Sequence, residues 1–519
     1  MNLTGPILQF LGCQDGVWGL SLMMVCDAGD PQPALRLNVP AELVGGASGP
    51  VPGLDATAWR FDIAVRQTAT PQRIGYRLGG RSASVQVPAL GATPTMAYVS
   101  CNGFSDARSR KSMKAPNALW ARMARLHEQQ ERVEGVPVGP LELLLMGGDQ
   151  IYSDDIWSTV SELRAWTEIE WFTRTHMPFS DSLRAALQTR FAEFYLERWN
   201  QPETAALLAS VPSVMMWDDH DIIDGWGSHS AELHSSPVFQ GLFAVARSAF
   251  ELFQRQMLGA PPPATLPAQT AHNSACRFGH TGLLVLDLRS ERRPCTETTD
   301  AAGRKTVQAD QVMSPASWAA VYAWLDAQLA AGDLRHLLVM SSIPVMHPSF
   351  EQLEKMLGAL PAIEELEDDL RDHWTSPPHR AERLRLVRRL LDASARGLRV
   401  TVLSGDVHVA ALGVIESDRS DLTVEARSLT QLTSSGVTHP PPAGVARYFL
   451  EEACRQPDTL EPGLTGRMME FPTTRRRLIG CRNFMTLQAD PPGGDDRLWV
   501  NWWAEGTDHP FTKVVLPVA

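Results

Sequence analysis

The sequence predicts an α/β protein with a small all-β segment at its N-terminus. Short apolar runs recur along most of the chain with helix-like stretches between them, as is typical of strands buried on both faces and joined by helices. The first part of the chain differs, because glycine and proline turns separate its apolar runs. With 519 residues, 44% of them hydrophobic, the chain is long enough for a large core and at least one smaller module.

Residues 1–92 are expected to form an N-terminal β module. Apolar runs at 19–25 and 59–65 are divided by turn-forming residues such as Gly45-Gly46. The turn-rich stretch 91–95 marks the expected boundary, so residues 93–519 would form the larger domain.

Six apolar runs predict the buried strands of this larger domain. Helical spacing of apolar residues predicts helical insertions near 158–210 and 230–260, and a basic amphipathic helix over 381–393. The tail from Arg482 regains strand-like character. The six runs are 97–99, 143–146, 214–216, 283–286, 337–340 and 400–403.

Composition limits the possible partners. The formal net charge of -12 argues against tight, non-specific binding of long nucleic acids, which requires basic residues to neutralise phosphates, but it leaves a small anionic substrate open. Seven dispersed cysteines without a CxxC pair favour a reducing compartment. The sequence shows no signal peptide, twin-arginine leader or membrane-spanning run, so a cytoplasmic location is expected. The oligomeric state is not indicated.

Polar side chains that can bind metals follow almost every predicted strand. Because ligands bind in the crevice at the carboxyl ends of strands in α/β sheets, these side chains are expected to converge. Two cations held by shared carboxylates can activate water, orient a phosphate ester and stabilise its leaving oxygen. The residues that follow the strands are Cys101 and Asn102, Asp149 to Tyr152, Asp218 to Asp221, Ser341 and Ser342 with His347 beyond them, and Asp406 to His408.

Cys101 and three motifs, GDQIY at 148–152, WDDHD at 217–221 and GDVH at 405–408, resemble in this order the alkaline phosphatase D (PhoD-like) branch of the calcineurin-like metallophosphoesterases. They are also similar to the purple acid phosphatase pattern, in which a tyrosine ligand follows a GD motif. The resemblance covers residues 96 to 440, and the N-terminal β module also fits it. It implies a metallophosphoesterase-type four-layer α/β/β/α core that hydrolyses phosphate mono- or diesters with a metal-bound hydroxide.

The resemblance also implies the metals and the first group of ligands. Fe³⁺ with Ca²⁺ is expected, with Mn²⁺, Mg²⁺ or Zn²⁺ as alternatives. Asp149 corresponds to the bridging ligand and Tyr152 to the phenolate ligand of iron. Cys101 takes the position of the usual first-motif aspartate, either alone or with Asn102, because the Asp-x-His form of that motif is absent.

The second group of implied ligands is richer in oxygen. Asp219 stands where the asparagine of a GNH motif would be, and His220 stands where the histidine of that motif acts on the leaving group. Asp406 and His408 take the places of two histidines in the final motif. The histidine expected after the fifth strand is missing, and either His347 or calcium with water would fill that gap.

Several interpretations stay open at this point. Arg289 either binds the substrate phosphate or pairs with Asp287, and Asp218 and Asp221 support the ligands or cap a helix. The leading prediction is a phosphoesterase acting on a small phosphate ester. The alternatives are a non-catalytic or weakly active metal-binding scaffold of the same fold, and a nuclease or phospholipase that uses the same site.

Overall fold

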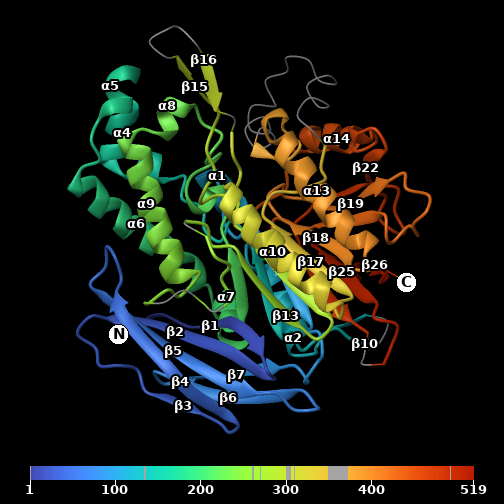
Figure 1. Ribbon diagram of the computed structural model, residues 1–519. Helices are drawn as coiled ribbons and strands as arrows, with labels where there is room; N and C mark the ends of the chain where they lie inside the picture. The colour runs from blue at the N-terminus through green and yellow to red at the C-terminus, as the bar shows by residue number, and fades with distance from the viewer. Residues whose placement is uncertain are drawn as a thin grey trace.

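Two large β-sheets form the centre of the protein in the computed structural model (Figure 1). The structure describes residues 2–518 except 134–135, 260–261, 263, 269, 300–304, 309, 349–371 and 491–492. The protein is a mixed α/β structure, and all six apolar runs predicted as strands are strands.

The first sheet has ten strands in the described part of the chain, and its central strands are parallel. Antiparallel strands extend it on both sides. The parallel strands are β8 (Met96–Val99), β11 (Leu143–Gly147), β12 (Ser213–Met216) and β1 (Asn2–Gln14). The extensions are β2 (Val17–Asp27), β5 (Ala56–Arg66) and β4 (Ala41–Pro50) on one side, and β24 (Asn483–Ala489), β25 (Leu498–Ala504) and β26 (Phe511–Val515) on the other.

The second sheet has nine strands within the described residues, and its central strands are also parallel. These are β14 (Thr281–Leu286), β17 (His336–Ser341), β18 (Arg399–Ser404) and β20 (Ser428–Thr433). Its other strands are β13 (Ser274–Phe278), β19 (Ala410–Ser417), β21 (Asp458–Glu461), β22 (Leu464–Met468) and β23 (Leu478–Ile479).

Alternating side chains of the central strands enter different hydrophobic clusters. In β11, Leu143 and Leu145 belong to a cluster that also contains Leu338 of the second sheet, whereas Leu144 and Met146 pack in a cluster with helices. Each sheet therefore has the other sheet on one face and helices on the opposite face. The helices of the first sheet's cluster are α2 (Ala118–His127), α6 (Asp181–Trp199), α7 (Pro202–Ser210) and α9 (Pro237–Phe253). Those of the second sheet are α10 (Pro315–Ala331), α13 (Arg380–Ala395) and α14 (Gly444–Ala453).

The N-terminal segment contains only strands among its described elements, as expected, but it shares a sheet with the rest of the protein. Gln9 of β1 pairs in parallel with Ser213 of β12, so four N-terminal strands continue the ten-stranded sheet. The strands β3 (Leu35–Leu37), β6 (Gln72–Leu78) and β7 (Arg81–Val87) form a separate sheet. The division of the chain at residue 92 stays a prediction, and strand pairing crosses it.

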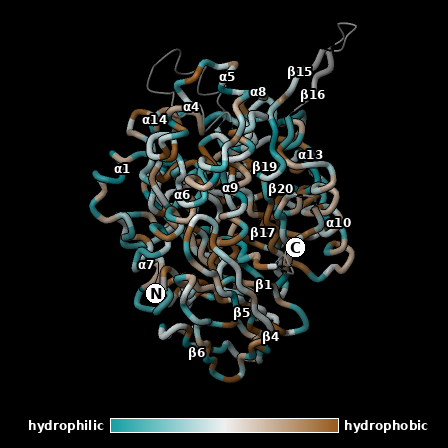
Figure 2. The backbone as a smooth tube through the Cα atoms, turned by 90° about the vertical axis from the view of Figure 1, so that its left-hand side faces the viewer, coloured by the Kyte–Doolittle hydropathy of each residue, from teal (hydrophilic) through white to brown (hydrophobic). Residues whose placement is uncertain are grey.

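Figure 2 shows apolar residues along the central strands and more hydrophilic residues in outer segments such as the region of α1 (Ala107–Ser112). None of the helices in the described ranges combines the length and apolar character needed to cross a bilayer. The carboxyl ends of β8, β11, β12 and β18 lead into the four loops that carry the predicted ligands.

Candidate metal centre

Four buried or partly buried aspartates from three loops meet at the carboxyl ends of the strands. One oxygen from each of Asp149, Asp218, Asp219 and Asp406 lies within 4.8 Å of the others, and we call this set the acidic cluster. A second, overlapping group joins Asp149 and Asp219 to a ring nitrogen of His220 at the same limit. Three predicted ligands, Asp149, Asp219 and Asp406, are therefore brought together.

The acidic cluster has the donor set of a cation site. Oδ1 of Asp149, Oδ2 of Asp218 and Oδ1 of Asp219 are buried and accept no hydrogen bond from any described residue. Buried charged oxygens without partners are costly, and cations remove that cost. Burial raises the pKa of Asp149 and Asp218, and neighbouring carboxylates add to the rise. The residues therefore fit hard cations, which prefer carboxylate oxygens.

Four of the predicted ligands have an uncommon backbone conformation. Cys101, Asp149, Asp406 and His408 have φ angles of 56°, 54°, 71° and 53°. Residues with a Cβ rarely adopt this left-handed region, and they cluster at functional sites when they do. The strand-to-loop turns thus fix the direction of these four side chains at a cost in backbone energy.

The glycines beside two ligands bring the loops together. A Cβ atom on Gly148 would lie 2.8 Å from Cβ of Asp218, and one on Gly405 would lie 2.3 Å from Oγ of Ser100. In the structure, the close approach is between one ligand loop and the next.

Cys101 and Tyr152 both contact the same oxygen of Asp149. Sγ of Cys101 lies 3.4 Å from Oδ2 of Asp149, and the hydroxyl of Tyr152 lies 3.3 Å from it. Burial raises the pKa of the Cys101 thiol and of the Tyr152 phenol. A bound cation would lower the pKa of both groups again, because it stabilises the deprotonated forms that act as metal ligands. The two side chains expected on the iron side of the centre are thus adjacent to the expected bridging aspartate.

Asn102 faces a different set of partners. Its Oδ1 accepts hydrogen bonds from Trp120, Arg198 and Thr438. The remaining group of the side chain, Nδ2, is a donor and cannot bind a metal. Asn102 therefore braces the loop after β8, and its suggested role beside Cys101 has no support in this geometry.

His408 lies in a stack of aromatic rings. Its ring is 3.8 Å from that of His439, which in turn is 5.2 Å from Tyr152, and Tyr152 is 4.3 Å from His220 on its other side. The ring nitrogen Nδ1 of His408 is buried and has no hydrogen-bond partner among the described residues. His439 was missed in the sequence because its proline-rich surroundings indicated only a loop.

His220 is held by an aspartate that sequence reasoning also missed. Nδ1 of His220 lies 2.5 Å from Oδ2 of Asp154, which leaves Nε2 as the ring nitrogen available to the acidic cluster. Burial alone would lower the pKa of His220, but the charges of Asp154 and Asp219 outweigh it and raise the pKa well above its usual value. In the sequence, only the position of Asp154, two residues after Tyr152, distinguishes it from other aspartates.

Arg289 is fully buried among carboxylates. Its guanidinium pairs with Asp218 and Asp372 and lies 3.5 Å from Oδ1 of Asp219. Arg289 donates to Asp287 through its backbone N–H and not through its guanidinium, so the suggested side-chain pair between them is not formed. Phosphate binding by Arg289 stays a prediction.

Asp221 supports the loops without offering a free oxygen. Its carboxylate accepts backbone N–H groups of Gln150, Ile151 and Asp218, and it caps the short 3-10 helix η1 (Asp219–Asp221). This matches the capping alternative suggested by the sequence. Asp218 is the N-cap residue of the same helix and also belongs to the acidic cluster.

His347, which the sequence offered for the missing ligand, lies farther from the acidic cluster than His373 does. Nε2 of His373 lies 2.6 Å from Oδ2 of Asp406, whereas His347 packs against His373 with ring centroids 5.6 Å apart. Among the described residues, the two groups of candidate ligands around Asp149 contain neither His347 nor His373. Ser342 follows β17, and its hydroxyl donates to Oδ1 of Asp218 at 2.8 Å.

Comparisons with known proteins agree with the resemblance in the motifs. The family model described as PhoD related phosphatase matches residues 98–365 and 359–456. A Saccharomyces cerevisiae protein described as uncharacterized is 24% identical over 477 residues, covering 76% of this chain and 64% of the yeast protein. The chain thus spans less than two thirds of that relative.

A solved structure of PhoD has the same fold, with a TM-score of 0.55 and 14% identity over 98% of this chain and 88% of the other. The family model spans more than half of the sequence and includes all three loops of the acidic cluster. The chain therefore belongs to the PhoD related phosphatase family.

Proposed function

We propose that the protein hydrolyses phosphate mono- or diesters at the acidic cluster. The observation that carries the proposal is the set of three buried carboxylate oxygens, on Asp149, Asp218 and Asp219, that have no hydrogen-bond partner among the described residues. We further propose that the helix and sheet packing corresponds to the four-layer α/β/β/α core of metallophosphoesterases, with residues 93–519 as the catalytic domain.

The residues suggest how two kinds of cation would be held. Asp149 would bridge them, Cys101 and Tyr152 would favour Fe³⁺, and the oxygen-rich side with Asp219 and Asp406 would favour Ca²⁺. His408 is proposed as a further ligand, and Mn²⁺, Mg²⁺ or Zn²⁺ are alternative metals. When bound, such cations neutralise the ester's negative charge and increase the acidity of coordinated water, as a metal-bound hydroxide mechanism requires.

The surrounding side chains have separate tasks in this proposal. His220 would donate a proton to the leaving oxygen from Nε2, while Asp154 holds its Nδ1. Arg289 would keep Asp218 in place and limit the repulsion between buried carboxylates. Binding of the substrate phosphate by Arg289 is the alternative role.

One observation favours a second candidate, a metal-binding scaffold with little or no activity. The hydroxyl of Ser342 bonds to Asp218 at the end of β17, where the resemblance implies a histidine ligand. A centre with fewer nitrogen ligands would bind metal and turn over slowly. A nuclease or phospholipase using the same site remains the third candidate, and the net charge of -12 disfavours long nucleic acids.

Metal content and hydrolysis measured on the same samples separate these candidates. The expected result is iron and calcium by elemental analysis, with turnover of p-nitrophenyl phosphate or its diester that chelation abolishes. Asp149→Asn should remove both metal and turnover. The matched control is Asp181→Asn, which makes the same change on a fully exposed side chain. Bound metal without turnover of either ester supports the scaffold, and absence of metal overturns the proposal.

A further inference from the structure

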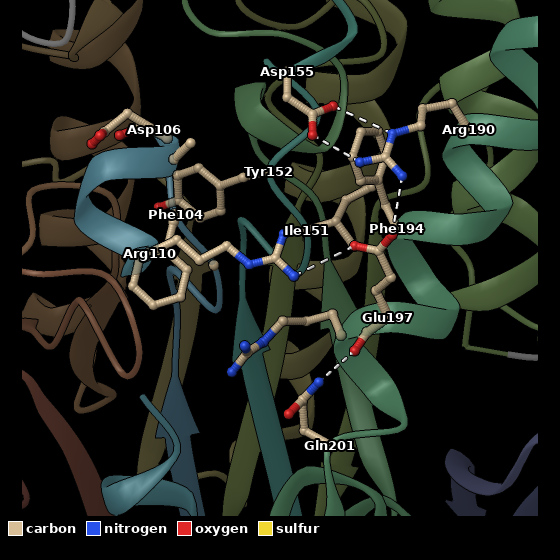
Figure 3. Close-up of a pocket in the computed structure, with 14 residues that line it drawn as sticks. Phe104, Asp106, Arg110, Ile151, Tyr152, Asp155, Arg190, Phe194, Glu197 and Gln201 are labelled. Atoms are coloured by element: carbon tan, nitrogen blue, oxygen red, sulfur yellow. Dashed lines mark hydrogen bonds and ion pairs between the residues drawn. The ribbon is translucent and has the colours of Figure 1, made fainter. Parts of the chain in front are cut away.

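A pocket of about 140 Å³ has Tyr152 in its wall (Figure 3). Its walls come from the loop after β8, from α1, from the loop after β11 and from α6. Tyr152 lines the pocket, and its hydroxyl lies 3.3 Å from Asp149. Tyr152 therefore belongs both to the wall of this pocket and to the candidate metal centre.

The carboxylates that line the pocket are already engaged. Asp106 caps α1 by accepting the backbone N–H groups of Arg108 and Ser109. Asp155 and Glu197 form ion pairs with Arg190 at 2.7 and 3.0 Å, as Figure 3 shows. The three lining carboxylates are balanced in number by three lining arginines, Arg110, Arg190 and Arg198.

Two lining arginines have unused positive charge. Arg198 donates to the neutral oxygens of Asn102, Asn117 and Thr438, and no described carboxylate forms an ion pair with it. Arg110 has a side chain that is 63% exposed, with one long contact of 3.9 Å to Glu197. Burial and the charge of Arg110 lower the pKa of Arg198 to about 10, which leaves it protonated at neutral pH.

The position of the pocket suggests which part of the substrate would enter it. His220, the proposed proton donor to the leaving oxygen, stacks on Tyr152 with ring centroids 4.3 Å apart. The leaving alcohol would therefore lie on the Tyr152 side of the centre. A charged group on that alcohol would reach the two arginines.

We propose that this pocket binds a second phosphate group carried by the alcohol part of the ester. The preferred substrates would then be esters with two separated phosphates. This inference rests on the proposed phosphoesterase activity and adds a substrate class to it. Guanidinium groups suit phosphate because their planar donors match its oxygens.

Hydrolysis of matched ester pairs tests the proposal. The substrates are bisphosphates of straight-chain diols of increasing length, each compared with the monophosphate of the same diol. The expected result is a kcat/KM ratio of bisphosphate to monophosphate of about tenfold or more at one chain length. Arg110→Gln should lower that ratio several-fold, and Arg198→Lys should change the preferred length.

The matched control is Arg108→Gln, which removes an exposed arginine from the same helix but outside the pocket. It should leave the ratio unchanged. A wild-type ratio near one at every length, with the monophosphates hydrolysed, overturns the second-phosphate site and leaves the proposed function intact. An equal fall of the ratio in the Arg108 and Arg110 variants also overturns the site, because it would show a general charge effect.

Failure of the proposed function gives a different result, in which no ester is hydrolysed. The pocket is then tested by calorimetric titration of the protein with 1,4-butanediol bisphosphate. Binding that Arg110→Gln weakens and Arg108→Gln does not would support the site. Absent binding, or binding that neither variant changes, would overturn it.

Discussion

The two sheets contribute differently to the candidate metal centre. Strands β11 and β12 of the ten-stranded sheet lead into Asp149, Asp218 and Asp219, each of which has a carboxylate oxygen within 4.8 Å of the others. Strands β14 and β17 of the nine-stranded sheet lead instead into Arg289 and Ser342, which donate to Asp218. The first sheet thus supplies most of the negative charge, and the second sheet mainly holds and balances it.

The largest expected effect comes from removing a charge on the first sheet. Asp149→Asn should lower turnover by at least ~10³-fold and reduce bound metal, because a neutral amide cannot bridge two cations. Elemental analysis and steady-state kinetics on one preparation measure both. Normal metal content with near-normal turnover would show that Asp149 is not the bridging ligand.

His220→Ala tests whether the first sheet also supplies the proton donor. Turnover should fall by about 10²–10⁴-fold while most metal is retained, with a smaller loss for esters whose leaving groups need less protonation. Rates across esters of graded leaving-group pKa measure this. If the losses are equal across the series, or if the metal is lost, His220 acts as a ligand or a structural residue.

Arg289→Met tests the balancing role of the second sheet. Removing one partner of a buried ion pair leaves unpaired charge, so the free energy of unfolding should fall by about 3–5 kcal/mol. Added cation should restore part of this loss, as chemical denaturation with and without metal would reveal. A variant with unchanged stability but a raised KM would instead support phosphate binding by Arg289.

Tyr152→Phe is expected to have the smallest effect on turnover. If the phenolate binds ferric iron, the protein should be coloured and this variant should lose or shift the visible band. Tyr195→Phe is a suitable control, since Tyr195 is buried away from the acidic cluster and bonds to Gln254. An active, colourless, iron-free wild-type protein would restrict the centre to other metals.

Local patterns were sufficient to predict the strands and several residues of the acidic cluster. Four-residue apolar runs marked β11 and β17, and a polar motif directly after a strand marked Asp149 and Asp406. Both features arise within a few residues, so they are visible without knowledge of the fold.

The remaining features depend on contacts between distant segments. The pairing of Gln9 with Ser213 joins β1 to a strand about 200 residues later, and nothing local distinguishes β1 from a strand of a separate module. Asp372 and His439 are recognisable only by their partners, Arg289 and the Tyr152 and His408 rings. Sequence patterns therefore identified the residues of the acidic cluster better than the groups around them.

The four left-handed ligand positions have a consequence for protein engineering. Glycine at Cys101, Asp149, Asp406 or His408 would relieve a backbone cost of roughly 1 kcal/mol or more at each position. A library selected only for heat resistance without metal would therefore enrich glycine at these positions and discard the ligands. Selection in the presence of the cation would reverse this preference, because binding of the cation to these side chains then stabilises the folded protein.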